Sequence, residues 1–352
     1  MMRVMDLTGR TAALVDVQAS LACEMLASLV AFTSPDTWHT LENQPWSFDE
    51  LRTRLRSDFI EGLDQPWGAL FGLATLPPLA WDVEALIHRV EAMSEREFTL
   101  LLLGYNFPTL RQTHGVTIQR AADGELQAVQ QLLADSEYAE WGKGSVARAI
   151  TLPPEDVRRR LIGALRAWHT EVFQPMESWI GGVLRRDAQA KAAVSRTMPS
   201  EQFIDFATGG LQYSPHPPFR RVLLVPHVAM RPWNLLNEFE DTYIICYPVA
   251  DESLRVDRTA PPARLVRLYR ALDDEKRLRI LKRLARSSAT LQEVAEVAGV
   301  AKSTAHHHLV ILRSAGLVRT GIDKESRYSL RSEAIPEVAG WLEAFLKENL
   351  TV

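Results

Sequence analysis

Cysteine is scarce in this sequence: only Cys23 and Cys246 occur among 352 residues, and they lie far apart in the chain. Such a pair predicts free, buried thiols rather than a disulfide framework. Long hydrophobic runs are also missing. The longest apolar stretch, around residues 98–103, falls far short of the ~20 residues of a membrane helix. The N-terminus lacks the charged-then-apolar pattern of a signal peptide. We therefore expect a cytoplasmic protein with no membrane partner.

Motifs of the common catalytic and cofactor sites are absent as well. The chain contains no G-x-S-x-G, no H-E-x-x-H and no Rossmann glycine run, which are the patterns of hydrolases, zinc proteases and dinucleotide sites. The run His306-His307-His308 does not predict a metal site, because consecutive residues of a helix point about 100° apart and cannot converge on one ion. We expect no enzymatic activity, no cofactor and no metal.

The charge of the chain is unevenly distributed. Hydrophobic residues make up 46% and charged residues 24%, the composition of a folded globular protein, and the length predicts two or three domains. The net charge is −4, yet residues 262–352 hold 16 Lys and Arg against 11 Asp and Glu, whereas residues 1–261 hold 24 against 33. A basic C-terminal part on an acidic body indicates that one end of the chain contacts nucleic acid.

The segment 257–262 (DRTAPP) divides the chain into two predicted domains. Proline fixes its own backbone and disfavours helix in the residue before it, and a helical pattern begins directly afterwards. We expect a mostly helical regulatory domain over 1–260 and a DNA-binding domain over 261–352. The predicted fold class is mainly α, with a small β element in the N-terminal domain.

The hydrophobic pattern of the N-terminal domain predicts helices and two strands. The helices are expected over 21–32, 47–63, 81–103 and 154–184, with Pro175 kinking or ending the last one. The strands, expected over 221–226 and 242–248, could pair as a small sheet.

The C-terminal domain shows the order of a winged helix-turn-helix. Helices are predicted over 263–272, 275–285 and 290–298, and Gly299 ends the third in a turn. A fourth helix is predicted from about Lys302, then a hairpin of 317–320 and 327–330, then a helix over 333–350. In the second of these helices Leu278, Leu281 and Leu284 are expected to face inward.

The helix from Lys302 is the expected recognition helix, whose N-terminal residues contact base edges in the major groove. Ala305, His308, Leu309 and Leu312 share its inward face, whereas Ser303, His306, His307, Val310 and Arg313 face outward. The predicted DNA contacts, in the helix and the hairpin together, are Lys302, Ser303, Thr304, His306, His307, Arg313, Arg319, Lys324 and Arg327.

The stretches RALDDEKRLRILKRLA, LQEVAEVAGVAKSTAHHHLVILRSAGLVR and RYSL resemble the ArsR-type (arsenical-resistance repressor) winged-helix family. The arrangement is similar to large ArsR-like regulators with a long N-terminal region. This resemblance implies a homodimeric repressor that binds operator DNA and leaves it when an effector binds. It places the dimer contacts at Leu265, Leu268, Val338, Leu342 and Phe345. The helices that hold the metal ligands of many members lack those ligands here, so metal sensing is not expected.

Eight of the nine tryptophans lie before residue 261. They could form an effector pocket or a core built from large side chains, and core is the favoured interpretation for most of them. A pocket would be lined by Trp67, Phe71, Trp168, Phe173 and Trp179. The effector could be a small molecule or a protein. The N-terminal domain could alternatively be an enzyme or a protein-interaction scaffold tethered to the DNA-binding module.

Overall fold

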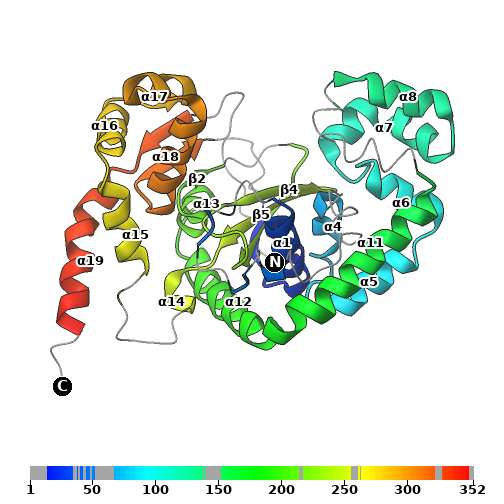
Figure 1. Cartoon of the computed structure of the whole chain (residues 1–352), viewed down its shortest axis with the longest axis horizontal. Coiled ribbons are helices and arrows are strands. Elements are labelled where there is room, and N and C mark those ends of the chain that lie inside the picture. Colours follow the sequence, from blue (N-terminus) through cyan, green and yellow to red (C-terminus); the bar gives the residue numbers. More distant parts are fainter. Residues whose placement is uncertain are drawn as a thin grey trace. The chain divides into compact units, whose positions relative to one another are not determined.

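The computed structural model (Figure 1) describes residues 14–34, 38, 40–42, 45–47, 50–51, 67–136, 138, 152–213, 217–254, 261, 263–321 and 327–348. Two compact units divide the chain. The first comprises Met1–Ala188, Pro215–Arg231 and Leu235–Cys246, and the second comprises Gln189–Ser214, Pro232–Asn234 and Tyr247–Val352. The domain boundary predicted between residues 260 and 261 stays a prediction. In the described part of the chain, no helix combines the length and the apolar character needed to cross a membrane.

A four-stranded sheet forms the centre of the first unit, in the order β1-β3-β5-β4. The strands are β1 (Leu14–Val17), β3 (Arg221–His227), β4 (Leu235–Phe239) and β5 (Thr242–Pro248). β1 runs parallel to β3 with Leu14 opposite Arg221, and β4 runs antiparallel to β5 with Leu235 opposite Cys246. The two predicted strands are confirmed as neighbours. β1 and β4 are additional to the prediction.

Helix α1 (Leu21–Thr33) is the core helix of this unit and packs against β3. Its sequence, LACEMLASLVAFT, is mostly apolar, and nearly all of its residues are buried, Glu24 and Ser28 included, as expected of a helix enclosed by other elements. Ser20 caps its start by accepting a hydrogen bond from the Cys23 amide at 3.0 Å. Cys23 and Cys246 are free, buried thiols, as predicted. Their mutual hydrogen bond and their burial raise the pKa of Cys246 well above its usual value.

The remaining helices of this region follow the predictions only in part. They are α4 (Trp67–Leu73), α5 (Val83–Glu91), α6 (Glu95–Leu102), α7 (Pro108–Ala122), α8 (Leu126–Ala134), α11 (Pro154–Trp168), the π-turn η2 (His169–Phe173) and α12 (Gln174–Ser195). The single helix expected over 81–103 is wrong, because Ser94 and Glu97 form a capping box that starts a new helix. Pro175 does not end the helical run, because α12 starts at Gln174, directly after the π-turn, and continues through the proline. The kink at Pro175 stays a prediction. The helix expected over 47–63 lies almost entirely outside the described residues.

The second unit begins with α13 (Ser200–Thr208) and the short strand β2 (Leu211–Gln212) and continues with α14 (Asp251–Leu254). The C-terminal elements, yellow to red in Figure 1, are α15 (Ala263–Leu272), α16 (Glu275–Leu284), β6 (Ala289–Thr290), α17 (Leu291–Ala298), α18 (Lys302–Ser314), β7 (Val318–Gly321), β8 (Arg327–Leu330) and α19 (Ala334–Glu348). The strands form a sheet in the order β2-β7-β8-β6. Every helix and strand predicted after residue 262 is present, with shifts of one or two residues at the ends.

The core beneath these helices includes Leu268, Ile280, Leu284, Leu309 and Leu312. Two predicted orientations are wrong. Leu278 was expected to face inward but is 47% exposed, because the buried face of α16 runs through Ile280 and Leu284, a second register that the same leucine-rich pattern allows. Val310 was expected to face outward but is buried, on a helix face that carries a further contact described below.

Candidate nucleic-acid interface

Helices α17 and α18 form a helix-turn-helix. Thr290 and Glu293 make the capping box that starts α17, with the Thr290 amide donating to Glu293 Oε2 at 2.8 Å. The helix ends at Gly299, whose φ of 64° lies in the left-handed region, where a residue without Cβ is favoured. Only Val300 and Ala301 then separate Gly299 from α18. This tight turn fixes the position of the α18 N-terminus in the unit.

The inward face of α18 anchors the helix. Ala305, Leu309 and Leu312 are almost completely buried and belong to the core of the unit. His308 is also buried, and burial is the main cause that lowers its pKa, with Asp274 opposing. His308 is therefore a packing residue, in agreement with its predicted inward position.

The first turn of α18 is exposed. Lys302, Ser303 and Thr304 all lie open to solvent, and Ala301 at the N-cap position gives no side-chain hydrogen bond. Unpaired backbone amides and the positive end of the helix dipole therefore lie beside a lysine and two hydroxyl groups. Such a helix start attracts anions, phosphates included. His306 is exposed and His307 is half-buried on the following turn.

Trp233, from the segment Pro232–Asn234 of the same unit, lies on the outward face of α18. Its ring stacks on His306 with centroids 5.8 Å apart and an interplanar angle of 25°. The guanidinium carbon of Arg313 lies 5.5 Å from the centre of the same ring, which is cation–π distance. Val310, which is buried, lies between His306 and Arg313 on this helix face. Burial, then the charges of Arg313 and His307, lowers the pKa of His306.

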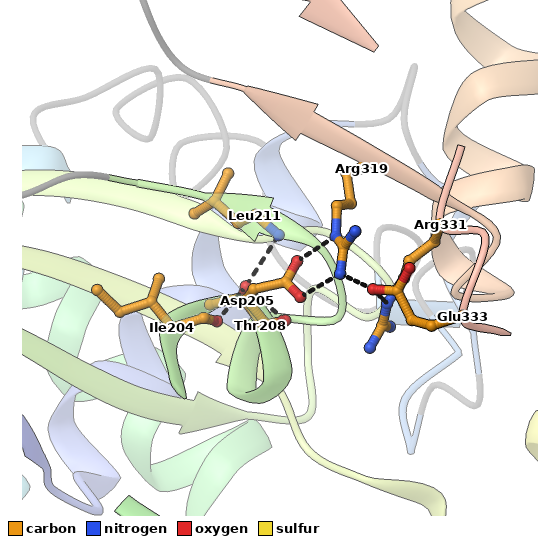
Figure 2. Close-up of polar contacts among 7 residues, drawn as sticks. All are labelled: Ile204, Asp205, Thr208, Leu211, Arg319, Arg331 and Glu333. Atoms are coloured by element: carbon orange, nitrogen blue, oxygen red, sulfur yellow. Dashed lines mark hydrogen bonds and ion pairs between the residues drawn. The ribbon is translucent and has the colours of Figure 1, made fainter. Parts of the chain in front are cut away.

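Arg319, at the second position of β7, is held by two carboxylates (Figure 2). Its Nε and Nη2 donate to Oδ1 and Oδ2 of Asp205, each at 3.0 Å, and Nη2 also donates to Glu333. The hydrogen bond and charge of Asp205 raise the pKa of Arg319. The guanidinium is only 19% exposed. Arg319 was predicted to contact DNA, and in this conformation it contacts Asp205 of α13 and Glu333, the residue before α19, instead.

The other predicted contacts of the hairpin differ in their environment. Arg327 is exposed and donates to Ser288 Oγ and to the Ser288 carbonyl, both at 3.2 Å. Lys324 lies outside the described residues. The structure thus brings His306 and Arg313 together on one helix face. Trp233 and Asp205, which contact predicted DNA-binding residues, were not predicted. A tryptophan beside Pro232 in a connection between strands is the signal that could have identified the first, because core periodicity does not explain it.

The residues proposed to line an effector pocket lie mostly in the core of the first unit. Trp168 and Phe173 are fully buried, and Trp168 Nε1 donates to Ser28 Oγ at 2.8 Å. Phe71 is buried and Trp179 is 36% exposed, and the side chain of Trp67 lies outside the described residues. In the described part of the chain, no three His, Cys, Asp or Glu side chains are grouped as they would be around a metal ion. The effector-pocket role of these aromatic residues stays a prediction.

Comparison with known proteins places the helix-turn-helix in a family. The model of the helix-turn-helix domain family matches residues 272–321. Over 80 residues the chain is 39% identical to YceK, an uncharacterized HTH-type transcriptional regulator of Bacillus subtilis (strain 168), and this alignment covers 22% of the chain and 80% of that protein. No solved structure matches the chain. The chain therefore belongs to the HTH-type transcriptional regulators, a family of DNA-binding proteins.

Proposed function

We propose that the protein is a homodimeric repressor of the ArsR type in which α18 is the recognition helix and the β7–β8 hairpin is the wing. The observation that carries this proposal is the exposed first turn of α18, Lys302–Thr304, held in place by the left-handed turn at Gly299. Its amides and the Lys302 ammonium supply the contacts with phosphates and base edges that a recognition helix makes. Arg327 extends the basic surface along the hairpin.

The dimer is proposed to form through α15 and α19. Leu265 and Leu268 are buried within the single chain, Leu342 and Phe345 are half-buried, and the side chain of Val338 lies outside the described residues. Large apolar side chains remain exposed on the same two helices, namely Tyr269, Ile335 and Leu346. We expect these three residues to complete the interface. Dimerisation then places two copies of α18 about one DNA turn apart, roughly 34 Å.

The N-terminal region, 1–260, is proposed to sense a small-molecule or protein effector rather than to catalyse a reaction. An effector that changes the distance between two recognition helices by a few ångströms prevents both from docking on the same duplex. DNA binding, and with it repression, is lost when the effector changes the spacing of the two recognition helices. The cytoplasmic location stays a prediction.

Fluorescence anisotropy with DNA from upstream of the protein's own operon tests the proposal. We expect specific binding whose affinity falls steeply with salt, because neutralised phosphates release counterions. Lys302→Ala should weaken binding and lower the slope of log Kd against log salt by about 0.9 per protomer, the contribution of one phosphate contact in each subunit. Lys282→Ala is the matched control, because Lys282 is an exposed lysine on α16, outside both the proposed recognition helix and the proposed dimer interface. Equal affinity for all sequences at every salt concentration would contradict the proposal.

A further inference from the structure

The sheet of the second unit contains a strand that the helix-turn-helix itself does not supply. β2 pairs in parallel with β7, with Leu211 opposite Thr320 and Gln212 opposite Gly321. The Thr320 amide donates to the Gly210 carbonyl at 3.0 Å and extends this pairing by one residue. β2 belongs to residues 1–260, the part predicted to regulate DNA binding. The hairpin proposed as the wing is therefore bonded along one edge to the regulatory part of the sequence.

Two consecutive glycines allow β2 to approach β7 so closely. Gly209 ends α13 with a φ of 71°, and Gly210 follows with a φ of 114°. A Cβ on Gly210 would lie 3.0 Å from the Val318 carbonyl oxygen, whereas a Cβ on Gly209 would meet nothing within 4 Å. Both positions have a backbone conformation that favours glycine, but only Gly210 also needs the missing Cβ for contact with β7.

An ion pair between Asp205 and Arg319, drawn in Figure 2, reinforces the pairing of β2 with β7. Asp205, one turn before the end of α13, receives a bidentate pair of hydrogen bonds from Arg319, the geometry in which a guanidinium also binds a phosphate. Asp205 thus occupies the guanidinium edge that a DNA phosphate would use. Asp205 and Glu333 also place two negative charges beside the hairpin, where they oppose an approaching phosphate.

Trp233 is linked to α13, the helix before β2, through its neighbour Asn234. Asn234 Nδ2 donates to the Thr208 carbonyl at the C-terminal end of α13 at 3.1 Å. The indole stacks on His306 and lies at cation–π distance from Arg313 of α18, two of the predicted DNA contacts. Residues 205–212 and 232–234, named here the clamp, therefore contact both the recognition helix and the hairpin.

We propose that the clamp is autoinhibitory: it contacts the outward face of α18 beyond the exposed first turn and one edge of the hairpin in this structure, and DNA and the clamp compete for His306, Arg313 and Arg319. The inference rests on the proposed function, because it supposes that these residues bind DNA. An effector or partner that stabilises the open clamp favours DNA binding, and one that stabilises the closed clamp opposes it. A ligand has this effect only to the extent that it binds the two states with different affinity.

The test compares full-length variants that open the clamp in different ways. Gly210→Ala breaks the close approach of β2 to β7, and Trp233→Ala uncovers α18. Gly209→Ala is the control for the first, because it also places a Cβ at a positive φ but makes no contact with Val318. Trp81→Ala is the control for the second, because Trp81 also lies beside an arginine, with Arg185 Cζ 4.4 Å from its ring centre, but far from α18 in the sequence. We expect Gly210→Ala and Trp233→Ala to bind DNA about tenfold more tightly than the natural chain, within the 5- to 150-fold range of coupling between sites, and the controls to stay within about twofold.

Hydrogen exchange gives a second readout. Saturating DNA should increase amide exchange in residues 205–212, because DNA displaces the clamp. If the natural chain binds DNA but both variants bind equally or more weakly, or if exchange in 205–212 does not rise, the clamp is not autoinhibitory and the proposed function stands. If no version binds DNA at any salt concentration, the proposed function fails and the inference fails with it.

Discussion

Asp205 and Arg319 lie 114 positions apart in the sequence and meet through two hydrogen bonds of 3.0 Å each. Both side chains are largely shielded from water, with 15% and 19% exposed. A bidentate pair with limited solvent access is stronger than an ordinary surface ion pair. If a DNA phosphate competes with Asp205 for Arg319, removing the Asp205 carboxylate should therefore change the affinity for DNA.

Asp205→Asn should strengthen DNA binding and change its salt dependence. The amide keeps the size of the carboxylate but loses the charge, so Arg319 becomes available to one phosphate per protomer. We expect the slope of log Kd against log salt to become steeper by about 0.9 per protomer. When Arg319→Ala is added to both proteins, the natural chain and the Asp205→Asn variant should no longer differ in slope. Anisotropy titrations at several salt concentrations measure these slopes. An unchanged slope in Asp205→Asn would show that Arg319 does not bind phosphate.

Substitution of two glycines should shift stability in opposite directions. Gly299→Ala places a Cβ at a φ of 64° and should destabilise the second unit by about 1 kcal/mol. Gly163 lies inside α11 with open space around its missing Cβ, so Gly163→Ala should stabilise the chain by about 0.5–1 kcal/mol. Urea denaturation followed by circular dichroism measures both. A stabilising Gly299→Ala would contradict the turn geometry on which the position of α18 depends.

DNA affinity should increase as the pH falls below about 7. Burial beside Trp233, together with the charges of Arg313 and His307, lowers the pKa of His306, so the closed clamp favours the neutral imidazole. A nearby phosphate favours the protonated imidazole and raises that pKa. DNA binding therefore takes up protons, and acid favours the complex. His306→Gln should flatten the profile of log Kd against pH between about 5.5 and 7.5, whereas His88→Gln, at an exposed position on α5, should not. Identical profiles for His306→Gln and the natural chain would rule out this role.

The stability of the first unit should decrease as the pH rises toward 8. Burial raises the pKa of Glu24 to about 8, against the opposing hydrogen bonds from the Val228 and Ala229 amides. Between about 4.5, the usual value, and 8, the folded chain holds a proton that the unfolded chain releases. The free energy of unfolding therefore falls with pH in this window, by up to about 1.4 kcal/mol per pH unit, and levels off above it.

Glu24→Gln is the variant that isolates this effect. Its amide cannot ionise, so the dependence on pH should flatten between about 5 and 8. At the acid end of this range the variant should be less stable than the natural chain, because the amide nitrogen cannot accept one of the two backbone hydrogen bonds. Denaturation at a series of pH values measures the difference. A variant that keeps the full slope would mean that Glu24 is not the titrating group.

The sequence predicted the helix-turn-helix because local signals decide it. Caps at Thr290 and Glu293, a left-handed Gly299 and helical spacing of leucines act within a few residues of one another. The orientation of α16 could not be predicted in the same way, because its leucine-rich pattern fits two registers and only packing selected Ile280 over Leu278. The clamp could not be predicted either, since Asp205 and Trp233 meet their partners across separations of 114 and 73 positions, and no local periodicity encodes such pairs.

Enrichment of binding sites from a random pool of duplex DNA by the full-length protein tests most directly whether α18 is a recognition helix. We expect a defined sequence to emerge, composed of two related half-sites about one helical turn apart. We also expect Lys302→Ala to recover the same sequence with weaker enrichment, because Lys302 mainly contributes a phosphate contact. A pool that stays random after repeated rounds, with both the natural chain and the clamp variant Gly210→Ala, would contradict the assignment of α18 as a recognition helix.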